Sequence, residues 1–180
     1  MNCKTHPRKA TQAVARLIQK SGGKIEYLRL AKLSYLADRE SLIKRGIPIT
    51  GGTYFSMKKG PVISEILNFV LRRNAPGWKE MISPNRANML TLEGEPSFDS
   101  LSPRELEILD AIVARHEQLS TDELVQWCHD NCAEIVDVPA GRREGIEIES
   151  IFVAEHIPTE RITAVVGELE SLEKLDALLT

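Results

Sequence analysis

Residues 28–66 read LRLAKLSYLADRESLIKRGIPITGGTYFSMKKGPVISEI, and this stretch decides the fold. Its first half predicts a helix over residues 26–45 that stops at Gly46 and Pro48, because glycine often ends a helix and proline does not continue one. Apolar residues spread nearly all round this helix, which is typical of a helix at the centre of a fold. They are Leu28, Leu33, Tyr35, Leu36, Ala37, Leu42 and Ile43.

The second half begins with a crossing rich in glycine and threonine. Residues 53–57 predict a short strand or an extended crossing. Pro61 is expected at the first position of a helix that runs to about Arg73, since its fixed φ suits that position. Two lysines therefore precede the expected start of this helix.

The rest of the chain follows the helical period. A first helix is expected after Pro7, to about Ser21. Ser102 and Ser120 each open a helix, because a glutamate three residues later completes a capping box, and two more helices are expected over residues 147–155 and 159–178. Residues 81–82 and 89–92 predict a small hairpin. The fold class is therefore mainly α, a single compact multi-helix domain with a small β hairpin or extended crossing.

Composition points to a globular protein of ordinary size. The 180 residues are 42% hydrophobic and 27% charged, which fits one domain with a real core. No apolar run is long enough to cross a bilayer, and the first ten residues lack the apolar centre of a signal peptide. Three cysteines, an odd number, argue for a reducing compartment. We expect a cytoplasmic protein with no membrane partner.

The charge is distributed unevenly along the chain. Residues 1–75 hold 15 Lys and Arg against 4 Asp and Glu, a balance of +11, whereas residues 76–180 hold 8 against 22, a balance of −14. Either the two halves face each other and neutralise, or the basic half presents a surface to an acidic partner or to nucleic acid. We favour the first interpretation, because charges scattered around helices usually sit in water.

Soft ligands and bases occur together in the stretch around Cys128, His129 and Cys132, with His116 on the preceding helix. A structural zinc site usually needs two well-spaced pairs of ligands, and here there is one loose cluster. Neighbours on a helix point about 100° apart, so Cys128 and His129 do not form a nucleophile–base pair. His116 is expected in the core or at its boundary. We therefore expect no enzyme activity, no cofactor and no metal.

The junction of Lys58, Lys59, Gly60 and Pro61 is the first candidate binding site. If a helix starts at Pro61, its first amides and the two ammonium groups favour a negative charge there. An internal carboxylate, for which Asp38 is the candidate, fills that place in one interpretation. An acidic side chain of a partner docks there in the other, and the sequence leaves both open.

Arg39 is the second candidate, because Tyr35, Leu42 and Ile43 flank it on one helical arc. A guanidinium on an apolar arc is either paired inside the protein or lies at the rim of an interface. Interfaces often combine Arg with Tyr and Met, and Tyr54 and Met57 lie close by in the sequence. We favour the internal ion pair.

The ordered words KLxYLADRESL, RGxPITG, a tyrosine and GPVxS resemble the Panacea domain, the SocA-like antitoxin family of bacteria and phages. The firm resemblance covers residues 28–70. Residues 124–130 are a weaker echo, in which His129 matches, Cys128 replaces a hydroxyl residue and a following Trp is absent. The matching positions are Lys32, Tyr35, Asp38, Arg39, Gly51, Tyr54, Gly60 and Pro61.

The resemblance implies an antitoxin that neutralises a cognate protein toxin by direct contact, with a Panacea-like domain over residues 1–135 and a C-terminal helical extension over 136–180 packed on the same domain. We expect Tyr35, Asp38, Gly51 and His129 to shape the fold. The expected partner-binding residues are Arg39, Tyr54, Met57, Lys58, Lys59, Gly60 and Pro61. A homo-oligomer is left open. The alternative is a nucleic-acid-binding regulator that uses the basic half, although residues 46–60 form a longer link than the tight turn of a helix-turn-helix.

Overall fold

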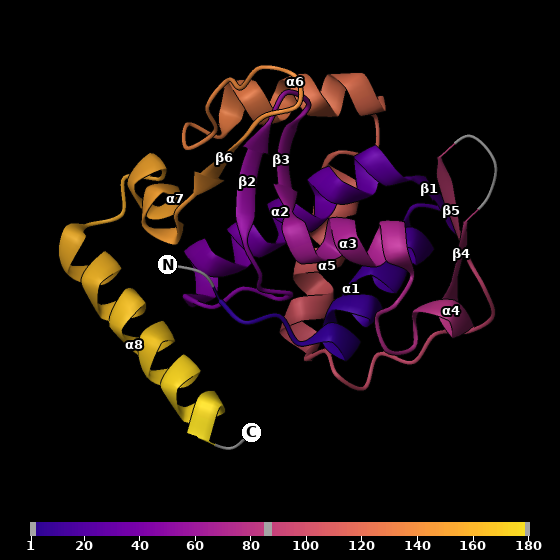
Figure 1. The fold of residues 1–180 in the computed structure, drawn as a ribbon, viewed down its shortest axis with the longest axis horizontal. Helices are drawn as coiled ribbons and strands as arrows, with labels where there is room; N and C mark the ends of the chain where they lie inside the picture. The colour runs from indigo at the N-terminus through magenta and orange to yellow at the C-terminus, as the bar shows by residue number, and fades with distance from the viewer. Residues whose placement is uncertain (1–2, 85–87, 179–180) are drawn as a thin grey trace.

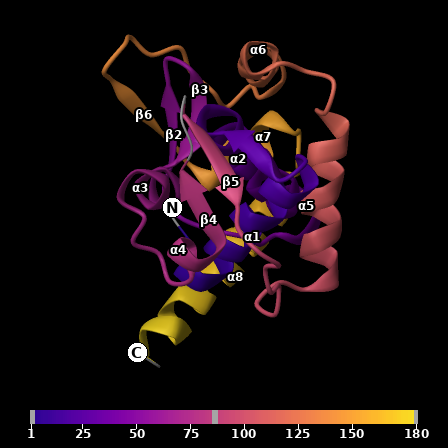
Figure 2. The ribbon, with the colours of Figure 1, turned by 90° about the vertical axis from the view of Figure 1, so that its right-hand side faces the viewer.

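The computed structural model describes residues 3–84 and 88–178, which form eight helices and six strands. The fold is mostly helical, as predicted. Figures 1 and 2 show α2 (Tyr27–Arg45) running through the middle of the molecule, with the other helices and two small sheets arranged around it. One continuous hydrophobic core joins residues from Cys3 to Leu169, so the described chain is one compact unit.

Helix α2 is central, as its all-round apolar pattern predicts. Most of its residues from Leu30 to Leu42 are buried, including the polar Lys32, Ser34, Asp38 and Ser41. The helix ends where expected, because Gly46 adopts a left-handed conformation (φ 75°) and donates its N–H to the carbonyl oxygen of Leu42. Burying polar groups on a central helix requires internal partners, and these partners build the site described below.

Three further helices pack around α2. Helix α1 (Pro7–Lys20) is buried on all sides over residues 10–15. Helices α5 (Pro103–Arg115) and α6 (Thr121–Asn131) have Ser102 and Ser120 as their N-caps. Both serines form the predicted capping box, in which the serine hydroxyl accepts from the glutamate N–H and the glutamate carboxylate accepts from the serine N–H. The predicted starts of these helices are therefore confirmed.

The helix predicted from Pro61 is wrong. Residues Gly60–Ile63 form strand β3, which pairs antiparallel with β2 (Tyr54–Met57), and helix α3 (Ser64–Arg72) begins only afterwards. The φ of proline suits an extended backbone as well as a first helical turn, and proline is tolerated on an edge strand such as β3. Lys58 and Lys59 are consequently the turn of a hairpin and do not precede a helix.

Two three-stranded antiparallel sheets complete the fold. The predicted hairpin is confirmed as β4 (Ile82–Pro84) and β5 (Met89–Leu92), and β1 (Lys24–Glu26) adds to β5. The second sheet has the order β3-β2-β6, where β6 (Arg143–Ile146) pairs with β2 in the register Met57 to Arg143. Neither β1 nor β6 was predicted, since strands of three and four residues give too short a pattern to recognise.

The C-terminal part adds α7 (Ile148–Ala154) and α8 (Thr159–Leu178), both close to the predicted bounds, while α4 (Trp78–Met81) is a single short turn after α3. Because β6 joins the sheet of β2, residues after 135 are built into the same core. The proposed division at residue 135 remains a prediction. Within the described ranges, no helix is long and apolar enough to cross a membrane.

The uneven charge is partly neutralised within the fold, in the manner of the favoured interpretation. Basic residues of the first half reach acidic residues of the second along α1 and α2. Arg16 and Lys20 both contact Asp110, and Lys9 and Arg45 both contact Glu105. The opposite halves of the sequence thus hold each other together.

Candidate partner-binding surface

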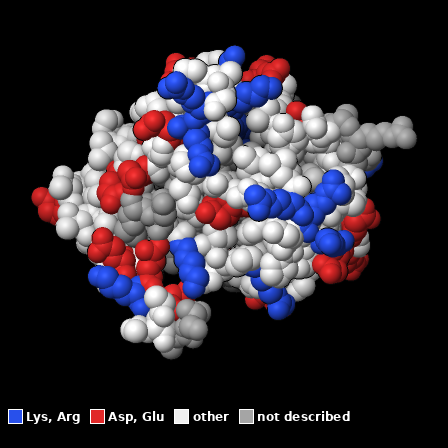
Figure 3. Space-filling view, viewed as in Figure 1, with Lys and Arg blue, Asp and Glu red and all other residues white. Residues whose placement is uncertain are grey.

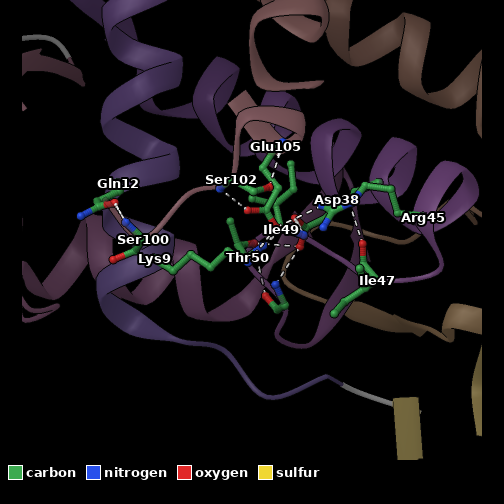
Figure 4. Close-up of polar contacts among 12 residues, drawn as sticks. Lys9, Gln12, Asp38, Arg45, Ile47, Ile49, Thr50, Ser100, Ser102 and Glu105 are labelled. Carbon is green, nitrogen blue, oxygen red and sulfur yellow. Dashed lines mark hydrogen bonds and ion pairs between the residues drawn. The ribbon is translucent and has the colours of Figure 1, made fainter. Parts of the chain in front are cut away.

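A buried carboxylate ties helix α2 to the loop that precedes β2. Oδ1 of Asp38 accepts the backbone N–H groups of Ile49 (3.0 Å) and Thr50 (2.8 Å). Oδ2 accepts the N–H of Gly51 (3.0 Å), the Thr50 hydroxyl (2.8 Å) and the Tyr54 hydroxyl (3.0 Å). We call this arrangement the Asp38 clamp (Figure 4). It satisfies loop amides that would otherwise be buried without partners.

The clamp sets the position of the whole β2–β3 hairpin. Gly51 has φ 65°, and a Cβ added there would lie 2.8 Å from the carbonyl oxygen of Lys4, so a larger residue does not fit. Burial raises the pKa of Asp38 to about 6, and the hydrogen bonds from Thr50, Tyr54 and Ile49 keep it from rising more. The hairpin therefore leaves the core from a fixed base.

A second polar cluster continues from the clamp (Figure 4). Ser41 donates to the carbonyl oxygen of Ile47, and Arg45 donates to Ser41 and to Glu105. The buried Glu105 also accepts a hydrogen bond from Nζ of Lys9, at 2.7 Å from its Oε1. Helices α1, α2 and α5 and the 47–51 loop are thus joined by a single network.

Arg39 is paired inside the chain, in the way that we favoured. Its Nε donates to Oε1 of Glu134 at 2.7 Å, and its Nη2 contacts Glu155 at 2.7 Å. The same oxygen of Glu134 accepts the hydroxyl of Tyr35 at 2.6 Å. Although burial favours the neutral form, Glu134 holds the pKa of Arg39 above its ordinary value. This cluster joins α2 to the segment after α6 and to the end of α7.

The seven expected partner-binding residues divide by exposure. Lys58 and Lys59 are exposed and Met57 is half-buried, whereas Tyr54, Gly60 and Pro61 are buried and the Arg39 side chain is only 11% exposed. Asp38 does not fill a place beside the two lysines, because its oxygens are directed to residues 49–51 and Tyr54; that expectation is wrong. A partner-binding role for the seven stays a prediction, and the surface positions are the ones that a rigid partner reaches.

Sequence reasoning missed the residues that complete this surface. The guanidinium of Arg143 lies 4.3 Å from the centre of the Phe55 ring, and β6 brings Arg143 opposite Met57. Arg142 precedes it and is exposed. No local sequence pattern links β6 to β2, since they are separated by more than 80 residues. We define the hairpin patch as Phe55, Met57, Lys58, Lys59, Arg142 and Arg143.

The hairpin patch carries positive charge that the described residues leave unpaired. None of the salt bridges within residues 3–84 and 88–178 uses Lys58, Lys59, Arg142 or Arg143. Figure 3 shows basic side chains gathered at the upper edge of the molecule, over the tip of β2 and β3, with acidic side chains at the flanks. The patch therefore suits an acidic surface.

Lys32 lies beneath the hairpin. Its side chain is fully buried, and its Nζ donates to the carbonyl oxygen of Pro61 at 2.8 Å. Burial, together with a smaller effect of the nearby charge of Lys59, lowers the pKa of Lys32 to about 8. A buried ammonium thus links the central helix to the edge strand of the hairpin.

The cysteine and histidine side chains that the sequence grouped together lie in separate environments. Burial raises the pKa of the Cys128 and Cys132 thiols to about 12. His116 is buried, donates its Nδ1–H to the Ile112 carbonyl oxygen, and packs edge-on against Trp127. His129 lies 3.3 Å from Asp137. Among the residues that the structure describes, no group of three His, Cys, Asp or Glu is placed to hold a metal ion.

Residues 30–134 match the sequence model described as "Antitoxin SocA-like, Panacea domain". The chain belongs to the SocA-like Panacea antitoxin family. The match spans the Asp38 clamp, the β2–β3 hairpin and Glu134, and it ends before β6, α7 and α8. No curated protein and no solved structure matches the chain. The family resemblance read from residues 28–70 is thereby confirmed.

Proposed function

We propose that this Panacea-domain protein neutralises a cognate toxin by direct protein–protein binding, through the hairpin patch. The observation that carries the proposal is a set of unpaired cations around two half-buried apolar side chains, Phe55 and Met57, on a hairpin whose base is fixed by the Asp38 clamp. A rigid patch of this kind loses little conformational freedom when it binds.

The chemistry of the patch defines its partner. Lysine and arginine steer an acidic surface toward the hairpin, while Phe55 and Met57 supply the apolar contact that longer-lived complexes need. The toxin is therefore expected to present carboxylates around an apolar centre. Tyr54, Gly60 and Pro61 support this surface from inside, and Arg39 holds the helix behind it.

The proposal includes no chemical step. Cys128 and Cys132 are protonated at neutral pH because burial raises the pKa of their thiols, so neither supplies a thiolate nucleophile. Three free cysteines, all buried, fit a reducing compartment, and we place the protein in the cytoplasm. In this proposal the protein neutralises the toxin by binding to it and covering part of its surface.

Co-expression with the product of the neighbouring gene tests this function. That product alone is expected to arrest growth, and the two proteins together are expected to restore growth and to co-purify. A harmless neighbour that does not co-purify would contradict the proposal. Binding to DNA that weakens steeply with added salt, without a toxin complex, would instead support the nucleic-acid-binding alternative.

A further inference from the structure

The sheet formed by β3, β2 and β6 has two edges that differ in how they are covered. At one edge, β3 packs against α2 and α6, and all four of its residues are buried. Pro61 offers no N–H there, and Nζ of Lys32 occupies its carbonyl oxygen. At the other edge, the β6 residues Arg143, Glu144 and Gly145 are exposed, and Figure 2 shows β6 at the outer left margin of the molecule. The edge at β6 is therefore the accessible one.

The proline of β3 fixes which backbone groups of the sheet are already used. In an antiparallel pair of strands, residues that exchange N–H···O bonds alternate with residues that do not. Pro61 has no N–H, so its pair with Ser56 does not exchange such bonds, and the N–H and C=O of Ser56 point toward β6. Since Ser56 lies opposite Glu144, it is the backbone of Glu144 that bonds to β2. The N–H and C=O groups of its neighbours Arg143 and Gly145 consequently point away from β2.

Two observations support this alternation. Ser64 donates its N–H to the carbonyl oxygen of Thr53 at 2.9 Å, so the backbone of Thr53 turns toward β3, three positions before Ser56 and in the opposite phase. Within residues 3–84 and 88–178, Arg143 and Gly145 have no backbone hydrogen-bond partner outside the sheet. A Cβ added at Gly145 would lie more than 4 Å from the parts of the chain packed around it, so the space beside the strand is open. We call this feature the β6 edge.

The side chains around the β6 edge determine which occupant fits it. Lys58, Lys59, Arg142 and Arg143 surround the start of the strand, whereas Glu144 is exposed on the strand face opposite to Arg143. An added strand alternates its side chains in the same way, so its residue opposite Arg143 favours a carboxylate and its residue opposite Glu144 favours an uncharged or basic group. A second copy of the chain would bring a second set of the same cations to this edge, which is unfavourable.

We infer that an extended segment of the toxin pairs with the β6 edge and adds a strand to the sheet, with an acidic side chain opposite Arg143. The inference rests on the proposed function and specifies how the toxin meets the hairpin patch. Main-chain hydrogen bonds to Arg143 and Gly145 supply affinity in this mode of recognition, and the side chains at alternate positions of the added strand supply specificity.

The first test compares two substitutions at one position. G145P removes the outward N–H and leaves the backbone bonds of Glu144 to β2 in place, and proline is tolerated on an edge strand. G145A keeps the N–H, and there is room for its Cβ. G145P is expected to weaken binding of the neighbouring gene's product by about tenfold or more, while G145A stays within about twofold. Thermal unfolding of each variant checks that the fold is kept.

Amide hydrogen exchange, followed by NMR, gives a second measurement on the wild-type protein. In the free protein the amides of Glu144 and Ile146 are expected to be protected by β2, whereas those of Arg143 and Gly145 exchange fast. Adding the neighbouring gene's product is expected to slow exchange at Arg143 and Gly145 by about tenfold or more. Contact through side chains alone would give these two amides no acceptor, so it would not slow them to this extent.

Each outcome has a distinct meaning. If the product binds, the amides of Arg143 and Gly145 stay fast and G145P binds as well as G145A, the inference fails and the proposed function stands. If the wild-type protein does not bind the product, the proposed function fails and the inference fails with it. If these amides become protected when the free protein is concentrated without the product, the occupant is a second copy and the inference is overturned. If G145P does not fold, the exchange measurement decides.

Discussion

Asp38 and Thr50 lie twelve positions apart and are joined by two hydrogen bonds of 2.8 Å, one from the Thr50 amide to Oδ1 and one from its hydroxyl to Oδ2. The pair fixes the loop after α2 on the helix itself. Since the same loop leads into the β2–β3 hairpin, the position of the hairpin patch depends on this carboxylate.

Replacing Asp38 by Asn is expected to destabilise the protein by about 2–4 kcal/mol. Both Asp38 oxygens accept hydrogen bonds, whereas the side-chain nitrogen of Asn would place its own donors against the N–H and O–H groups of the loop. Urea unfolding measures the loss. D130N is the matched control: Asp130 is exposed and accepts a hydrogen bond from Gln126 of its own helix, so its free energy of unfolding is expected to change by less than about 0.5 kcal/mol. Equal effects of the two substitutions would show that the clamp contributes little.

Glu134 and Glu155 share one guanidinium but differ in burial, with side chains 0% and 38% exposed. E134Q is expected to cost about 3 kcal/mol or more, since it leaves Arg39 and Tyr35 without a buried carboxylate. E155Q is expected to cost less than about 1 kcal/mol, because its ion pair is partly screened by water. Chemical denaturation of the two variants compares them, and a larger loss for E155Q would contradict the assignment.

Much of the fold was predictable from local signals. The central helix and both capping boxes depend on residues within a few positions of each other, and the structure confirms them. Pro61 misled because its φ suits a strand as well as a helix start, and only pairing with Ser56 decides between them. The cationic partner of Phe55, Arg143, lies 88 positions away, a distance that no local pattern in one sequence reveals.

The buried polar residues around α2 were also only partly predictable from the sequence. The resemblance marked Asp38 and Arg39 as motif positions, and helical spacing favoured an internal ion pair for Arg39. Neither identified Glu134, which approaches α2 only because the chain turns back after α6. Lys32 was a motif match with no assigned role, since burial of a lysine on an all-round apolar helix depends on tertiary packing.

Lys32 is expected to make stability depend on pH. Its pKa is about 8 in the folded protein against 10.5 as the ordinary value. Below pH 8 both states are protonated and the folded state bears the full cost of a buried charge. Between pH 8 and 10.5 the unfolded state binds more protons, so the contribution of this group to stability rises with pH, by an amount on the order of 3 kcal/mol.

The variant K32M removes that cost and is therefore expected to be more stable than the wild type at pH 7, with an advantage that shrinks by pH 10. The lost hydrogen bond to Pro61 offsets about 1 kcal/mol of the gain. Urea unfolding at both pH values tests this. K79M, at an exposed lysine of α4, is expected to show no such trend. A pH-independent difference for K32M would refute the assignment.

Charge reversal in the hairpin patch is expected to weaken binding of the toxin. K58E/K59E reverses two exposed charges at the tip of β2–β3, and it is expected to weaken binding of the neighbouring gene's product by about tenfold or more, mainly by repelling the toxin's carboxylates. Surface plasmon resonance at two salt concentrations measures this. Added salt is expected to weaken wild-type binding and to narrow its difference from the variant, since exposed charges are screened.

R72E/K79E is the matched control, because it makes the same change in net charge at exposed positions of α3 and α4. If long-range attraction to the whole protein governed binding, the two double variants would weaken it equally. If the hairpin patch is the contact, only K58E/K59E does so, and the loss appears in the dissociation rate as well as in the association rate. Equal losses would therefore remove the patch from the proposed interface, while leaving an electrostatically steered antitoxin.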